Sequence, residues 1–194
     1  MLLYHGSSTN IEKTLKPHRA FDRWDYTPQV YLTDEFERAL LYAINPIEVY
    51  IKNKFHKDIR CAATSAHFFD MKKPITLIEF YPNMIAETYL NRRAYIYVCE
   101  IDTGKVRNNG GNQFTIDHEI DFFQKIEMEN VYSEILSLQE SEKLKLLHFG
   151  DIDFYNTYFE REHLISSLSS RKAHCTSPEE ESFFDMVKKY FPIE

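Results

Sequence analysis

The residues whose types and spacing suit chemistry gather near the start of the chain. His5 and Gly6 end a short apolar run, and Tyr31 and Tyr42 follow with ten residues between them. A histidine at a strand end can hydrogen-bond a sugar hydroxyl, and a glycine after it lets a ligand approach the backbone. Because aromatic faces attract cationic rings, the pattern fits a slot for a flat, positively charged ring beside a ribose. A capped strand with a turn glycine and two core tyrosines is the alternative that short motifs leave open.

A flat cationic ring beside a ribose indicates a nicotinamide dinucleotide, and breaking its nicotinamide–ribose bond calls for a carboxylate. The sugar develops oxocarbenium character in such a reaction, and a nearby negative charge stabilises it. Asp117 and Glu119 lie on a run that looks extended from residue 114 to residue 123. Alternation along a strand would place both carboxylates on one face, about 7 Å apart. A solvated strand edge is the other interpretation of this pair, and Glu127 and Glu134 are the alternative carboxylates.

Together these segments resemble the ADP-ribosyltransferase superfamily, specifically the His-Tyr-Glu branch of diphtheria-type toxins, poly-ADP-ribose polymerases and small bacterial transferases. Tyr-His-Gly-Ser at residues 4–7 is similar to the first motif of that branch. Val-Tyr-Leu-Thr at residues 30–33, with Tyr42, is similar to the second, and Asp-His-Glu at residues 117–119 is similar to the third. The motifs stand in the family's order, which makes a chance match less probable than for any one motif alone.

The resemblance implies an enzyme that transfers ADP-ribose from NAD, consumed as a substrate, to an acceptor and releases nicotinamide. His5 would bond the nicotinamide-side ribose, and Gly6 with Ser7 would help to hold the nicotinamide end of NAD. Tyr31 and Tyr42 would sandwich the nicotinamide ring. The resemblance thus makes these five residues the expected NAD-binding set, with His5 and Tyr31 also serving catalysis.

Glu119 would complete the catalytic group by bonding the ribose 2′-hydroxyl and steadying the oxocarbenium ion. The loop at residues 108–113 corresponds to a target-recognition loop in relatives, which makes Gln113 and Asp117 the expected acceptor-binding residues. Relatives that modify arginine carry Gln or Glu where this chain has Asp117, which argues against an arginine acceptor. Arg19 and Arg23 are the residues suggested for phosphate binding, and no metal site is expected.

Two other functions remain open for the same fold. One is a non-catalytic module that binds a nucleotide or a partner and serves in defence or phage biology. It would differ from a toxin-like transferase in having no turnover. The other is an enzyme that resembles RNA 2′-phosphotransferases, which rely on an arginine-rich active site. The acidic balance, with 23 Lys plus Arg against 30 Asp plus Glu and a net charge of −7, counts against that second option. It also disfavours a nucleic-acid acceptor, because phosphate binding needs positive patches.

Composition favours a soluble, cytoplasmic protein. The three cysteines, at positions 61, 99 and 175, form neither an even disulfide set nor a CxxC metal motif. No apolar run approaches the ~20 residues of a membrane span, and the start of the chain does not resemble a signal segment. Hydrophobic residues at 43% and aromatic residues at 15% indicate a packed core.

We expect an α+β fold, in which split, mostly antiparallel sheets form an NAD cleft. Residues 1–136 would form the ADP-ribosyltransferase-like catalytic domain, and residues 137–194 a helical extension packed on it or joined with it in one domain. Residues 94–101 are the clearest strand, being rich in β-branched and aromatic residues. Residues 75–81 suit a strand or a buried helix about equally.

Helices are expected in several places. Asp34 is a plausible N-cap for a helix that Pro46 would end or interrupt, and Ser177 with Pro178 announces the last helix through a capping box. Further helical patterns cover residues 11–15, 85–90, 140–149 and 154–168.

Overall fold

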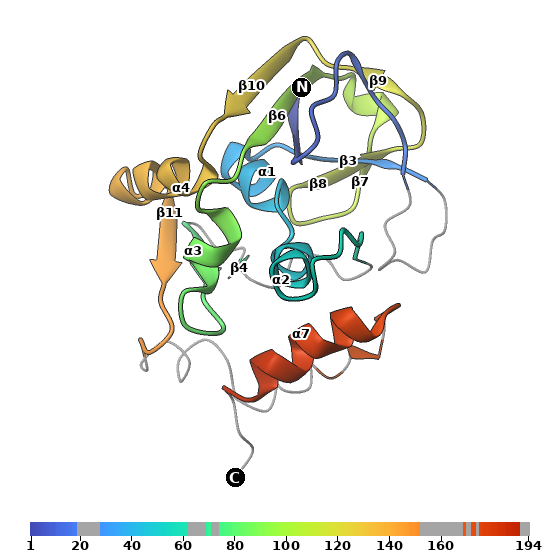
Figure 1. Cartoon of the computed structure of the whole chain (residues 1–194). Coiled ribbons are helices and arrows are strands. Elements are labelled where there is room, and N and C mark those ends of the chain that lie inside the picture. Colours follow the sequence, from blue (N-terminus) through green and yellow to red (C-terminus); the bar gives the residue numbers. More distant parts are fainter. Residues whose placement is uncertain are drawn as a thin grey trace. The chain divides into compact units, whose positions relative to one another are not determined.

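The computed structural model of the chain describes residues 1–18, 28–61, 69–70, 74–151, 169, 172–173 and 175–190 (Figure 1). The chain forms two compact units, each made of two separate stretches. The first unit comprises Met1–Ile44 and Tyr89–Leu144, and the second comprises Asn45–Thr88 and Lys145–Glu194. His5, Tyr31, Gln113 and the other described candidate residues all lie in the first unit. The predicted division at residue 136 stays a prediction.

The first unit is built on a six-stranded antiparallel sheet with the order β10-β6-β1-β3-β8-β7. Its strands are β1 (Leu2–Ser7), β3 (Val30–Thr33), β6 (Ala94–Glu100), β7 (Arg107–Asn108), β8 (Gln113–Ile116) and β10 (Gln124–Met128). The short strands β2 (Thr14–Leu15) and β9 (Ile120–Asp121) pair separately. Helices α1 (Phe36–Tyr42) and α4 (Val131–Glu140) and a 3₁₀ turn, η2 (Thr103–Lys105), complete the unit. The prediction of an α+β fold with mostly antiparallel strands is confirmed.

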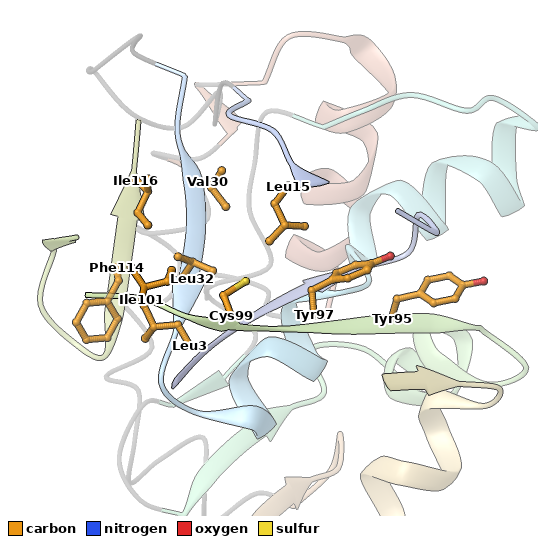
Figure 2. Packing of buried hydrophobic residues seen from close by; sticks show 10 residues of the cluster. All are labelled: Leu3, Leu15, Val30, Leu32, Tyr95, Tyr97, Cys99, Ile101, Phe114 and Ile116. Carbon is orange, nitrogen blue, oxygen red and sulfur yellow. The ribbon is translucent and has the colours of Figure 1, made fainter. Parts of the chain in front are cut away.

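The six-stranded sheet is narrowly joined at its middle. β1 pairs with β6 along its whole length, and β3 pairs with β8 along its whole length. β1 and β3 meet at one register pair, Tyr4 with Thr33. Figure 2 shows the strand that carries Tyr95 and Cys99 crossing the direction of the strands that carry Val30 and Ile116. The sheet therefore consists of two halves that separate on either side of this single pair.

The core of the first unit is formed by one apolar face from each half of the sheet. Directly opposed residues of an antiparallel pair share a face, so alternation along the strands sorts the side chains. The buried cluster comprises Leu3, Leu15, Val30, Leu32, Tyr95, Tyr97, Cys99, Ile101, Phe114 and Ile116 (Figure 2). On β3 and β8 this leaves Tyr31, Thr33, Gln113 and Thr115 on the opposite face.

Helix α1 covers that opposite face, and its predicted start and end need correction. Its N-cap is Glu35, whose side chain makes no capping bond, whereas Asp34 was expected to cap it. Pro46 does not end α1, because the helix already ends at Tyr42. The proline instead occupies the first turn of α2 (Pro46–Phe55), where a missing backbone N–H costs nothing.

Apart from single residues at the boundaries, Tyr89 and Leu144, the second unit contains α2, α3 (Met84–Tyr89), α7 (Pro178–Lys188) and the strands of a three-stranded sheet. Those strands are β4 (Phe69–Asp70), β5 (Ile75–Ile78) and β11 (Leu144–Leu147), in the order β11-β5-β4. The ambiguous apolar run after residue 74 is thus a strand. Helices α2 and α7 pack through Tyr50 and Phe183, whose ring centroids lie 5.3 Å apart.

Two of the expected helices are strands. The stretch 11–15 contains β2, and the stretch 140–149 contains the last residue of α4 and then β11. In β11 the exposed Lys145 stands between the buried Leu144 and Leu146, and this alternation suits a sheet. The helices predicted at 85–90 and after Ser177 are confirmed, whereas residues 154–168 lie outside the described part of the chain.

Candidate functional site

His5 is fixed at the point where the two halves of the sheet separate. It lies on β1, one residue beyond the pair that joins β1 to β3, and is half-buried. Its Nδ1 atom lies 2.8 Å from the carbonyl oxygen of Tyr31 on β3. Because a carbonyl only accepts hydrogen bonds, Nδ1 carries the proton and Nε2 is left as an acceptor in the neutral ring.

Burial also keeps this ring uncharged. Desolvation lowers the pKa of His5 from 6.5 to about 4, against the opposing effect of the Tyr31 hydrogen bond. The neighbouring His18 lowers the pKa of His5 further. At neutral pH the imidazole is therefore a neutral group whose Nε2 atom can accept a hydrogen bond, which suits a sugar hydroxyl better than an anion.

Two aromatic neighbours of His5 were missed by the sequence analysis. The His18 ring centroid lies 6.3 Å from that of His5 and 5.4 Å from that of Tyr31. Backbone hydrogen bonds in both directions between His18 and Gln29 hold His18 there. Tyr97, the register partner of His5 on β6, has its ring centroid 6.2 Å from the imidazole. The sequence does not predict these neighbours, because the position of Tyr97 depends on strand register and that of His18 on its pairing with Gln29. Neither can be deduced from the residues nearby in the sequence.

Gly6 and Ser7 follow His5 on β1. A Cβ at position 6 would lie 1.8 Å from the carbonyl oxygen of Ala39, so the close approach that demands glycine here is that of helix α1. The hydroxyl of Ser7 accepts a hydrogen bond from the backbone N–H of Thr9, 3.0 Å away. Their expected contacts with nicotinamide stay predictions.

Tyr42 and Gln113 form a second contact between candidate residues. Tyr42 is the last residue of α1, and Gln113 is the first of β8 and the register partner of Thr33. The side-chain amide of Gln113 donates to the hydroxyl of Tyr42 over 2.8 Å. A residue expected to bind nicotinamide thus touches one expected to bind the acceptor, on the face that Tyr31 shares.

The acidic pair does not have the predicted strand geometry. β8 ends at Ile116, and Asp117 to Glu119 form an exposed bend before β9. The strand-face prediction for Asp117 and Glu119 is therefore wrong, because the strand ends at the buried Ile116 and the chain bends at Asp117. His118 donates to Asp117 over 3.0 Å, which lowers the pKa of that carboxyl. Glu119 has a side chain 57% exposed and lies 3.5 Å from Lys16.

The remaining candidate residues add little to the geometry of the site. Glu127 on β10 pairs with Arg93 over 3.3 Å, and Glu134 lies half-buried on α4. Arg19 and Arg23 lie outside the described residues. Within the described part of the chain no group of three or more His, Cys, Asp or Glu side chains is arranged to hold a metal ion. In that same part, no helix is long and apolar enough to span a bilayer.

The geometry of the site therefore consists of two linked pairs, His5 with the Tyr31 carbonyl and Tyr42 with Gln113, in one unit of the fold. It offers a neutral imidazole acceptor, aromatic rings and an amide, and the carboxylate of Glu119 lies on an exposed bend of the same unit. Comparison of the chain with models of protein families, with curated proteins and with solved structures finds no match.

Proposed function

We propose that this protein cleaves NAD at the nicotinamide–ribose bond and transfers ADP-ribose to an acceptor. The observation that carries the proposal is the hydrogen bond between the His5 ring and the Tyr31 carbonyl, which joins two motifs 26 residues apart. It supports the proposal because it fixes the imidazole where β1 and β3 separate and leaves Nε2 as the acceptor nitrogen, which can bond a ribose hydroxyl. The hydrogen bond between Gln113 and Tyr42 adds support, because Tyr42 is the second tyrosine of the motifs and lies in the same unit.

The reaction would proceed by dissociation. The bond between C1′ of the ribose and the nicotinamide nitrogen breaks, its electron pair leaves with neutral nicotinamide, and the ribose becomes an oxocarbenium ion. An acceptor nucleophile then attacks C1′ and loses its proton. Water in that role gives free ADP-ribose. His5 would orient the ribose, and the faces of Tyr31 and Tyr42 would favour the cationic nicotinamide of the bound substrate.

The carboxylate contribution falls to Glu119 in this proposal. In this proposal Glu119 leaves its ion pair with Lys16 to reach the sugar, which is inexpensive because surface ion pairs contribute about 0–1 kcal/mol. The negative charge would then stabilise the oxocarbenium ion.

The experiment is nicotinamide release from NAD by the purified protein beside Glu119→Gln. Glu129→Gln is a matched control, because Glu129 is also an exposed, ion-paired glutamate of the first unit. We expect release by the wild type and the control, and a loss of about tenfold or more in Glu119→Gln. Equal release by all three would retain NAD cleavage and move the carboxylate elsewhere, whereas no release by the wild type would contradict the proposal.

A second candidate is an NAD-binding module without turnover. It is favoured by the chemistry of the residue that contacts Tyr42, since Gln113 carries an amide and cannot supply a negative charge. Calorimetric binding of NAD with no release of nicotinamide would support this function, and release would exclude it.

A further inference from the structure

Arg38 connects helix α1 to the turn between β7 and β8. Its side chain is 1% exposed, and its guanidinium pairs with Glu35 over 2.8 Å. Another guanidinium nitrogen, Nη1, donates to the carbonyl oxygen of Gly111 in the turn. Buried arginine is unusual in proteins and is found where its fork binds two partners at once.

The turn at residues 109–112, which Arg38 contacts, is also restrained by its own backbone conformation and hydrogen bonds. Gly110, Gly111 and Asn112 have φ angles of 81°, 55° and 59°, in the left-handed region that Gly and Asn tolerate. The N–H of Gln113 donates to the Gly110 carbonyl over 3.1 Å, and the N–H of Asn109 donates to the Gln113 carbonyl over 2.9 Å. A shift of the Gly111 carbonyl would therefore move the backbone of Gln113 as well.

Arg38 and Tyr42 stand four residues apart on α1, one helical turn, and so share a face of that helix. Arg38 contacts the turn at Gly111, and Tyr42 contacts the residue that follows the turn, Gln113. Helix α1 thus contacts the hairpin of β7 and β8 at two points. The first contact is made by the buried cation of Arg38, and the second by Tyr42, a candidate NAD-binding residue.

Stability alone is a weak reason for the buried cation. Among the described residues, the Nε atom of Arg38 is buried without a hydrogen-bond partner, which costs free energy. Replacing a buried ion pair by apolar side chains is often neutral or stabilising. A role in holding geometry accounts better for a buried charge at this position.

We propose that Arg38 is a positioning residue, which fixes the turn at residues 109–112 and thereby sets where the Gln113 amide meets Tyr42. The proposal rests on the proposed function for its kinetic consequence, namely the KM for NAD. Its structural consequence, the order of the turn, can be measured whether or not NAD is cleaved.

The kinetic test is a cycle of Arg38→Met and Gln113→Ala, with nicotinamide release as the assay. If Arg38 acts through Gln113, Arg38→Met raises the KM for NAD about tenfold in the wild-type background and less than about twofold in Gln113→Ala. The same factor in both backgrounds would show a merely structural role and overturn the proposal. Arg93→Met, an exposed arginine on the same unit, should leave the KM unchanged.

The structural test is amide hydrogen exchange. In Arg38→Met the amides of Asn109 and Gln113 should exchange at least about tenfold faster, while those of β1 and β6 keep their protection. Unchanged exchange in the turn, or faster exchange throughout the unit, would overturn the proposal. If Arg38→Met does not fold, Arg38→Lys serves, because its ammonium can pair with Glu35 but lacks the fork that also reaches Gly111. If the turn exchanges faster in Arg38→Met but the wild type does not cleave NAD, the proposed function is contradicted and the positioning role of Arg38 is retained.

Discussion

At the scale of single residues, His5 combines a half-buried neutral ring with one fixed tautomer. Its pKa is about 4 in the folded chain and 6.5 in the unfolded chain, so the unfolded chain binds more protons between these values. The stability from the neutral ring is full above pH 6.5 and falls as the pH drops toward 4. From pH 7 to pH 5 the loss from this group is about 2 kcal/mol.

This predicts a difference between the wild type and His5→Asn, whose amide can still donate to the Tyr31 carbonyl but does not titrate. The free energy of unfolding in urea, measured at pH 7 and pH 5, should fall by about 2 kcal/mol more in the wild type than in the variant. Other titrating groups are common to both proteins and cancel in this comparison. Equal pH dependence would show that the imidazole has the same pKa in the folded and unfolded chain, and so is not shielded from water in the fold.

Gly6 gives a second prediction at this scale. An alanine there would place its Cβ 1.8 Å from the Ala39 carbonyl oxygen, and a backbone atom cannot move aside as a side chain can. Gly6→Ala should therefore destabilise the protein by about 3 kcal/mol or more. The matched control is Gly104→Ala, whose Cβ would meet only Asp102 Oδ1 at 3.7 Å and should change stability by less than about 0.5 kcal/mol. Equal melting temperatures of the two variants would contradict the packing of α1 on β1.

At the scale of elements, Tyr97 connects β6 to the loop after β1. Its hydroxyl accepts from the N–H of Ile11 over 2.6 Å and donates to the carbonyl of Thr9 over 2.8 Å. Tyr97→Phe should cost about 1–2 kcal/mol, because two partly buried backbone groups lose their partner. Amide exchange of Ile11 should rise with it. Protection of Ile11 at the wild-type level would show that the loop is held by other contacts.

The start of α7 gives a prediction with an internal control. The Ser177 hydroxyl accepts from the N–H of Glu180 over 3.2 Å, and the Glu180 carboxylate accepts from the N–H of Thr176 over 2.6 Å. Ser177→Ala should lower the free energy of unfolding by about 1 kcal/mol, and Ser177→Thr by less, since threonine also caps helices. Equal losses in denaturant unfolding would assign the effect to something other than the cap.

Elements with strong local signals were predictable, and those set by tertiary pairing were not. The run before Glu100 is buried on both faces and reads as a strand, and Ser177 with Pro178 marks a helix start by local chemistry. The strand at Thr14 depends on pairing with Asp121, more than a hundred residues away, and no local pattern announces it. The bend at Asp117 likewise depends on where the core ends.

At the scale of the whole molecule, the sequence motifs name the segments of the candidate site, and the structure shows how those segments meet. His5 and Tyr31 are joined by a ring-to-carbonyl hydrogen bond, whereas their expected roles toward NAD stay predictions. The partners Arg38 and His18 were missed, because helix packing and strand separation create those contacts. The predicted roles of Glu119 and Asp117 depend on the exposed bend that replaces the expected strand.

The narrow join between the halves of the sheet determines where the His5 ring of the candidate site lies. Beyond Tyr4 and Thr33 the strands β1 and β3 no longer pair, and the His5 ring bonds the Tyr31 carbonyl there. The central claim of the proposed function is that residues at the place where β1 and β3 separate cleave NAD.

The most direct measurement is the rate of nicotinamide release from NAD by the wild type, His5→Asn and His56→Asn. His5→Asn keeps a donor for the Tyr31 carbonyl but has no group at the Nε2 position, and His56 is an exposed residue of the second unit. We predict release by the wild type and His56→Asn and at least about a tenfold loss in His5→Asn. No release by the wild type, or equal release by all three proteins, would contradict the account.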